Sequence, residues 1–260
     1  MKLYQVDAFT DEPFKGNPAG VCVLDGARGD AWMQALASEM NLSETAFVEP
    51  GDGPYRLRWF TPSTEVDLCG HATLASAHIL WETGLVKGTD SIAFDTRSGV
   101  LSANRAGDWI ELDFPATPEE ETPCNIDLDR GLGATPIYVG KSKFDFLVEL
   151  PSEQVLRDLK PDFIVLERAK SRGIIVTAHA AEDGYDFVSR FFAPQCGVDE
   201  DPVTGSSHCC LAPYWSKRLG KDEMVAYQAS ARGGTVRVRV DGSRVVLGGQ
   251  AVTVFDADLL

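Results

Sequence analysis

The chain has 260 residues, 44% of them hydrophobic, which is enough to fill one large core or two cores of about 130 residues each. Its formal net charge is −15, and no run of Lys and Arg offsets that charge, so we expect neither nucleic acid nor a membrane surface as a partner. The start MKLYQVDAF has no signal-peptide pattern, no later stretch approaches a membrane span, and the six cysteines form no CxxC pair. We expect a soluble cytoplasmic protein whose thiols stay reduced.

The first half of the chain alternates strand and helix patterns. A strand over 3–9 leads through the turn-rich EPFKGNPAG to a short strand over 21–24. Asp30 can cap a helix that runs to about Met40. The later segments are strands in NLSETAFVEP and RLRWF, a helix in HATLASAHILWET that Gly84 closes, and strands over 91–114.

The second half repeats this plan after a segment over 115–136, whose four prolines and weak apolar periodicity suit a linker. A helix over 206–219 contains Pro213 as a kink and stops at Gly220. The remaining predictions are strands over 137–150, a helix over 152–159, strands in GIIVTAHA and RFFAP, and strands over 224–228, 235–240 and 245–247.

An internal repeat with a spacing of about 135 residues relates the two halves. Upstream of the helices the spacing shortens, so that Arg58 of RWFTP matches Arg190 of RFFAP. We therefore predict two similar α/β halves that face one another across a cleft, with residues 1–114 in the first and 115–251 in the second, and with the tail 252–260 packed on the first half. The matches downstream are Gly70, Ala77, Arg97, Gly99, Gly107, Leu112 and Ala116 with Gly205, Ala212, Arg232, Gly234, Gly242, Leu247 and Ala251.

Two strand-to-helix junctions, DLCGHAT and DEDPVTGSSH, place Gly70 and Gly205 at helix starts. The first-turn amides of a helix have no partner within the helix, so such a junction can bind an anion without a basic side chain. Two facing junctions could hold a carboxylate. The alternative is that both glycines only permit a turn of the backbone.

Glu44 lies among the apolar residues of NLSETAF, where burial would raise the pKa of its carboxyl group toward neutrality, as suits a general acid/base. Its match in the repeat is Val176, which carries no proton, so a reaction with a single base is expected. The alternative is a capping or surface glutamate.

Different polar groups occupy the two junctions. His71 of the first junction matches Ser206 of the second, and His71 and Asp201 are further candidates for proton transfer or for orienting the substrate. Each could instead be structural, His71 as a solvated histidine and Asp201 as the start of a turn. A soft-metal site is the other alternative; its spacings differ from the usual chelate pairs, so we expect no metal, and no nucleotide cofactor is indicated. Its ligands would come from Cys69, His71, His208, Cys209 and Cys210.

Four ordered segments, GNPAGV, NLSETAF, FTPSTEVDLCGHATLASA and EDPVTGSSH, resemble the signature motifs of the phenazine-biosynthesis PhzF-like family. The resemblance covers nearly the whole chain. It implies a diaminopimelate-epimerase-like fold, in which two pseudo-symmetric domains each wrap a mixed, curved sheet around a central helix, and it implies a homodimer. The resemblance also implies an isomerase that moves a proton between carbons of a small carboxylate-bearing metabolite, without metal or coenzyme, although many relatives have no assigned substrate.

By the same resemblance, Glu44 is the proton-transferring acid, with His71 and Asp201 as its catalytic neighbours. Gly70, Gly205, Ser206 and Asn17 of GNPAGV are implied to bind the substrate. We therefore expect a cofactor-independent isomerase acting on a cyclic or unsaturated carboxylate. The alternatives are an amino-acid racemase or epimerase that uses Cys69, and a non-catalytic protein that binds small acids.

Overall fold

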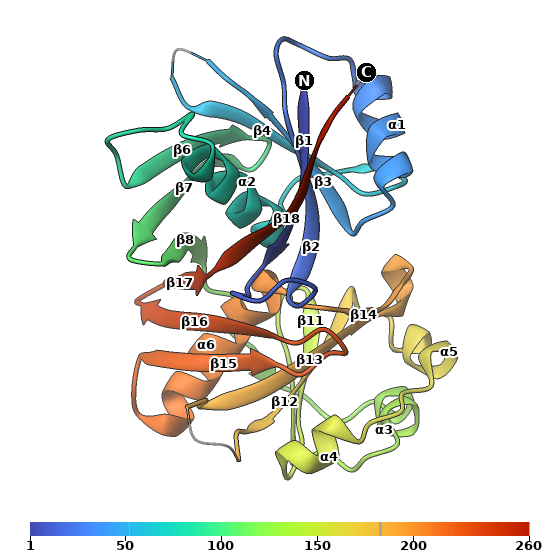
Figure 1. Ribbon diagram of the computed structural model, residues 1–260. Helices are drawn as coiled ribbons and strands as arrows, with labels where there is room; N and C mark the ends of the chain where they lie inside the picture. Colours follow the sequence, from blue (N-terminus) through green and yellow to red (C-terminus); the bar gives the residue numbers. More distant parts are fainter. Residues whose placement is uncertain (52, 182–183, 260) are drawn as a thin grey trace. The chain divides into compact units, whose positions relative to one another are not determined.

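The computed structural model describes residues 1–51, 53–181 and 184–259, and the chain divides into two compact units (Figure 1). Unit 1 comprises Met1–Asp113 and Gly248–Leu260, and unit 2 comprises Phe114–Leu247. This division falls one residue before the boundary that the repeat predicted after residue 114, and four residues before the one predicted after residue 251.

Unit 1 is built on a mixed sheet. β1 pairs antiparallel with β2, β2 parallel with β3, β3 antiparallel with β4, and β4 parallel with β6, from which antiparallel pairs continue to β7 and β8. The short β5 pairs with β4, and the last strand of the chain, β18, pairs with β1. The strands are β1 (Lys2–Ala8), β2 (Asn17–Val23), β3 (Glu44–Glu49), β4 (Tyr55–Phe60), β5 (Glu65–Val66), β6 (Ser91–Thr96), β7 (Gly99–Ala106), β8 (Trp109–Pro115) and β18 (Ala251–Asp258).

The helix α2 (Gly70–Glu82) forms the centre of unit 1. Its apolar side chains are buried on every side, as expected for a helix enclosed by other elements, and it packs against β1, β2, β3, β7 and β18. The second helix, α1 (Asp30–Met40), buries Met33 and Ala37 in a small cluster with Leu3 and Phe47. Figure 1 shows α2 lying against the curved strands of this unit.

Unit 2 repeats the strand pairings of unit 1. β10 pairs antiparallel with β11, β11 parallel with β12, β12 antiparallel with β13, β13 parallel with β15, and β15 antiparallel with β16. The strands are β9 (Glu120–Glu121), β10 (Tyr138–Lys141), β11 (Asp145–Glu149), β12 (Gly173–His179), β13 (Phe187–Ala193), β14 (Val198–Asp201), β15 (Glu223–Gln228), β16 (Gly234–Asp241) and β17 (Arg244–Gly249). The helices are α3 (Ile126–Leu132), α4 (Glu153–Arg157), α5 (Phe163–Leu166), η1 (Glu167–Ala169), η2 (Pro194–Cys196) and α6 (Gly205–Leu219).

Two corresponding ion pairs, one in each unit, support the duplication in addition to the shared strand order. Arg58 on β4 grips Glu65 through Nε and Nη2, both at 2.7 Å, and Arg190 on β13 grips Glu200 in the same way at 2.7 and 2.9 Å. Each guanidinium also lies over the phenylalanine two residues further along its strand, at 5.1 and 5.0 Å from the ring centroid. The predicted fold class, two similar halves each with a mixed sheet around a helix, is confirmed.

The strand register corrects one part of the predicted repeat. Phe47 pairs with Arg58 across β3 and β4, whereas Val176 pairs with Arg190 across β12 and β13. Since the two arginines correspond, Val176 corresponds to Phe47, and the match to Glu44 is Gly173. The sequence comparison missed this because the β12–β13 hairpin is longer than the β3–β4 hairpin, with 14 positions from Val176 to Arg190 against 11 from Phe47 to Arg58.

Three local predictions were also wrong. The supposed linker contains α3, which Asn125 caps by accepting a hydrogen bond from Asp127 N and which buries Leu128 and Leu132. The strand expected to start at residue 21 begins at Asn17. Pro18 has no backbone N–H to donate, but at this position β2 pairs with β1 alone, so a proline is tolerated there. Asp30 is the first helical residue rather than the cap, and its carboxylate accepts a hydrogen bond from Arg58.

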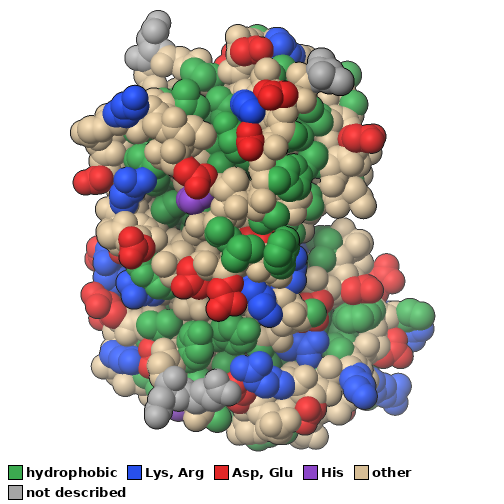
Figure 2. Space-filling view, viewed as in Figure 1, with side chains coloured by type: hydrophobic (Ala, Val, Ile, Leu, Met, Phe, Trp, Pro, Cys, Tyr) green, Lys and Arg blue, Asp and Glu red, His purple; other side chains and the backbone are tan. Residues whose placement is uncertain are grey.

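The surface mixes both signs of charge. Figure 2 shows acidic and basic side chains interspersed with apolar ones over the viewed face, without a continuous basic region on that face. Among the described residues, no helix combines the length and apolar character needed to cross a bilayer.

The central position of α2 predicts a strong dependence of stability on its buried side chains. Leu74→Ala should lower the free energy of unfolding by about 2–5 kcal/mol, since Leu74 is fully buried and its removal leaves a cavity. The matched substitution Leu85→Ala, at a half-exposed leucine beyond the helix, should change it by less than about 0.5 kcal/mol. Urea denaturation of both variants measures the difference, and equal effects would contradict the central role of α2.

Candidate functional site

The first junction brings Glu44, His71 and Cys69 together within unit 1. Glu44 begins β3, Cys69 is the residue before α2, and His71 lies in the first turn of that helix. Glu44 Oε2 lies 3.3 Å from His71 Nε2, and Cys69 Sγ lies 3.5 Å from His71 Nδ1. The histidine and cysteine side chains are buried, whereas the Glu44 side chain keeps a fifth of its surface exposed. The carboxylate is thus the solvent-facing end of this cluster.

The imidazole of this cluster is neutral at neutral pH, because burial lowers the pKa of His71 to about 4. A neutral imidazole donates through one nitrogen and accepts through the other. With its proton on Nε2, the imidazole faces the Glu44 carboxylate and can accept the Cys69 thiol proton on Nδ1. The 3.3 Å contact between Nε2 and Glu44 Oε2 is an approach of the two groups without hydrogen-bond geometry, and within the described residues Nε2 has no hydrogen-bond partner. Such a cluster can pass a proton to or from Glu44 without forming a cation in the core.

The same three side chains could coordinate a cation. Each offers one ligand atom, and within the described ranges these atoms lie within 4.8 Å of one another, which suits a divalent ion such as zinc. However, the imidazole meets Cys69 through one nitrogen and Glu44 through the other, and one nitrogen binds one ion. A shared metal would therefore require one of the two contacts to break, so the observed arrangement does not favour a shared metal.

The second junction, in unit 2, is held by an amide that sequence analysis missed. The Thr204 hydroxyl donates to the Asp201 carboxylate, and the fully buried Gln228 grips both ends of this loop. Its Nε2 donates to the Asp201 carbonyl at 2.8 Å, and its Oε1 accepts from Thr204 N at 2.9 Å. Gln228 ends β15, and no motif marked it, because its role arises from a pairing between distant segments.

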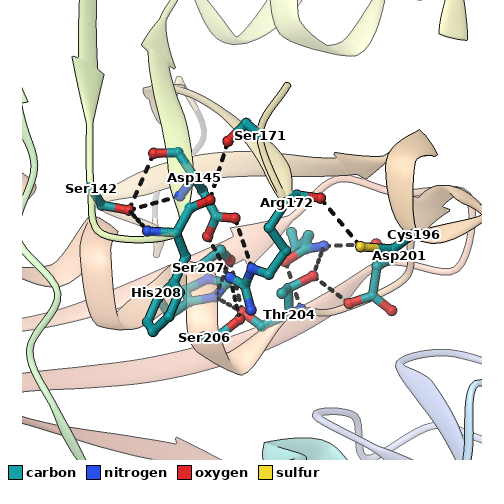
Figure 3. Close-up of polar contacts among 12 residues, drawn as sticks. Ser142, Asp145, Ser171, Arg172, Cys196, Asp201, Thr204, Ser206, Ser207 and His208 are labelled. Carbon is teal, nitrogen blue, oxygen red and sulfur yellow. Dashed lines mark hydrogen bonds and ion pairs between the residues drawn. The ribbon is translucent and has the colours of Figure 1, made fainter. Parts of the chain in front are cut away.

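The third polar group also belongs to unit 2 and contains Ser206 (Figure 3). Arg172, just before β12, donates to the Ser206 hydroxyl at 3.1 Å and to both oxygens of the buried Asp145 on β11, through Nε at 2.9 Å and through Nη2. Burial lowers the pKa of Arg172, but the Asp145 hydrogen bonds outweigh it, and the pKa is raised. Sequence analysis predicted Ser206 as a substrate contact and missed both of its supports.

Gly70 and Gly205 take the places that their motifs suggested, whereas Asn17 was expected in the turn-rich segment before the strand. Gly70 and Gly205 are the first residues of α2 and α6, each after a residue with extended backbone. Asn17 begins β2 and is fully buried. Glu44 and His71 are in contact in unit 1, while Asp201, Gly205 and Ser206 share the junction of unit 2. Their functional roles stay predictions.

Comparison with known proteins gives consistent matches. The model of a family described as phenazine biosynthesis-like protein, PhzC-PhzF, matches residues 6–257. An uncharacterized isomerase of Halalkalibacterium halodurans is 57% identical over 259 residues, which cover 99% of this chain and 98% of that protein. The crystal structure of a PhzF-family phenazine biosynthesis protein from Enterococcus faecalis has a TM-score of 0.95 at 41% identity and covers 99% of both chains. A probable proline racemase from Agrobacterium radiobacter shares the fold, with a TM-score of 0.68 at 12% identity over 100% of this chain and 92% of that one.

Burial of two histidines predicts how stability changes with pH. His208 of α6 is fully buried, and burial lowers its pKa, like that of His71, to about 4, against 6.5 for an unperturbed histidine. Between these two values the unfolded chain binds protons that the folded chain excludes, so stability is complete above pH 6.5 and falls as the pH drops toward 4. The loss approaches about 3 kcal/mol per histidine.

NMR titration of the imidazole resonances, with urea denaturation at pH 4.5 and 7, checks this prediction. His208→Asn should reduce the pH dependence, since it removes one of the two groups. Titration of either native imidazole near pH 6.5 would contradict it.

Proposed function

Because the chain belongs to the phenazine biosynthesis-like PhzC-PhzF family, whose curated relatives include isomerases, we propose that it is a cofactor-independent isomerase that moves a proton within a small carboxylated metabolite. Glu44 is the acid/base of this reaction, and His71 and Asp201 assist it. The observation that carries the proposal is the contact of the Glu44 carboxylate with a buried, neutral imidazole at 3.3 Å.

The proton balance of the reaction needs one base. The Glu44 carboxylate takes a proton from a carbon that is acidified by an adjacent double bond or carbonyl group, and the electron pair of that C–H bond shifts along the conjugated system. The carboxylic acid then returns the proton to another carbon, so that substrate and product are isomers. A proton on Nε2 of His71 stabilises the nearby carboxylate electrostatically, and the imidazole does not compete for the transferred proton, because its own pKa is low.

Unit 2 supplies no equivalent carboxylate at the matching strand position, where Gly173 stands. A Cβ atom at Gly173 would lie 2.1 Å from Cζ of Phe191, so the ring occupies the place of a side chain. This asymmetry supports proton transfer by one base rather than by two bases on opposite faces of a carbon.

The donors at the junctions support a substrate class. The first-turn amides of α2 and of α6 suit an anionic group such as a carboxylate. Such donors would also offset the negative charge that develops when a proton leaves a carbon next to that carboxylate. We propose a cyclic or unsaturated carboxylate as the substrate and a homodimer as the assembly.

A racemase or epimerase is the second candidate, favoured by one observation. Cys69 lies 3.5 Å from His71 Nδ1, a partner that could accept its thiol proton. Against it stands Thr204, which precedes α6 as Cys69 precedes α2 and whose hydroxyl donates to Asp201. A threonine hydroxyl is far too weak an acid or base to serve as the second partner.

Glu44→Gln tests the proposed base. In a carboxylic acid that the wild-type protein accepts as substrate, the substitution should lower solvent-deuterium exchange by at least about a hundredfold. The glutamine amide keeps the shape of the Glu44 side chain but cannot carry the proton. Mass spectrometry of a panel of small unsaturated carboxylic acids in D2O measures the exchange. Glu49→Gln, at the other end of β3, is the matched control and should keep the wild-type rate.

Exchange at a near-normal rate in the Glu44→Gln protein, with an intact fold, would show that the base lies elsewhere.

Cys69→Ala separates the two candidates. For a one-base isomerase, the variant should retain deuterium exchange within about tenfold of wild type, since the thiol meets His71 through Nδ1, the nitrogen that does not face Glu44. A two-base racemase would lose the exchange by several orders of magnitude. Alkylation of the wild-type protein by iodoacetamide gives an independent measurement, in which inactivation at Cys69 that substrate prevents would support the racemase.

A further inference from the structure

The two units place different chemical pairs at the same point of their shared topology. In unit 1, Glu44 at the start of β3 contacts His71 in the first turn of α2. In unit 2, the matching strand starts at Gly173, and its neighbour Arg172 contacts Ser206, the match of His71 in the first turn of α6. A carboxylate and an imidazole on one side thus correspond to a guanidinium and a hydroxyl on the other.

The guanidinium of Arg172 is held in one orientation. Asp145, with only 2% of its surface exposed, accepts from both Nε and Nη2, and this two-point contact fixes the guanidinium plane. The rings of Phe144 and Phe191 lie 5.1 and 5.8 Å from the guanidinium carbon. Figure 3 shows Arg172 pointing toward Ser206 from its place between Asp145 and the start of α6.

This contact determines the direction of the Ser206 hydroxyl. An arginine only donates, so the Ser206 oxygen must accept from Nη2, and its own proton points to another acceptor. Within the described ranges, no side chain or carbonyl accepts that proton, and none accepts from Nη1 of Arg172. Two donors are therefore left for a ligand, on side chains that keep part of their surface exposed.

We propose that Arg172 is a positioning residue that makes Ser206 a donor to an anionic oxygen of the ligand, and that this pair selects carboxylates over their neutral amides. A carboxylate oxygen accepts from Ser206 and from Nη1, whereas an amide would present its NH2 group to these donors in half of its orientations. The proposal deepens the proposed function, from which it takes the small carboxylate as the ligand.

The test compares benzoate with benzamide, which differ in charge and hardly in shape. Isothermal titration calorimetry at pH 7 should show that wild-type protein prefers benzoate. Arg172→Gln should weaken benzoate binding about tenfold or more, the usual scale for a hydrogen bond to a charged group, and leave benzamide within about twofold. The affinity of Arg172→Lys for benzoate should fall between those of the wild-type protein and Arg172→Gln. Arg168→Gln, at an exposed arginine of η1, should behave as wild type.

Ser206→Ala removes only the hydroxyl and should lose the same preference while Asp145 and Arg172 stay paired. Combined with Arg172→Gln, it should cause no further loss, because both changes act on one contact.

An unchanged preference for benzoate in Arg172→Gln or in Ser206→Ala would overturn the proposal. So would an equal loss for both ligands, which indicates a merely structural role, or an absence of preference in the wild-type protein. Glu44→Gln must keep the preference for benzoate, so failure of the proposed base and failure of this proposal are separate results.

Discussion

The burial of one long helix by the strands of each unit is the constraint on which the rest of the structure depends. In unit 1, the apolar side chains of α2 are buried around the helix. In unit 2, α6 buries Trp215 against Phe187, and the stacked ring centroids lie 5.6 Å apart. The indole Nε1 of Trp215 donates to the Thr177 hydroxyl inside the unit at 2.9 Å. Because each helix body is fixed, its first turn is fixed as well, and so are the side chains and free amides that this turn presents.

The sequence carried most of this architecture in its periodicity. Continuous apolar patterns located the long helices, and the glycines that precede or follow them located the junctions, because these signals depend on a few neighbouring residues. Elements without a long local pattern were harder. The helix α3 is held by a cap and two buried leucines, and β18 pairs with β1 from the opposite end of the chain.

The candidate site divides in the same way. Glu44, His71, Asp201 and Ser206 lie in motifs whose residue types already suggest chemistry, and contact between Glu44 and His71 joins two such motifs. Gln228, Arg172 and Asp145 lie in ordinary strand sequences, and their importance appears only when strands from distant parts of the chain pair. The repeat register failed for Glu44 for a related reason, since a hairpin of different length is visible in strand pairing and not in residue spacing.

The contact between Gly173 and Phe191 also bears on how two copies of one ancestral half can diverge. A carboxylate at this position of unit 2 needs more than one substitution, because the ring of Phe191 fills its space and the Asp145 carboxylate lies 3.1 Å from where a Cβ would be. A side chain at residue 173 therefore requires a smaller one at residue 191. The two positions are coupled, so an acid can be introduced here only together with a change of its neighbour.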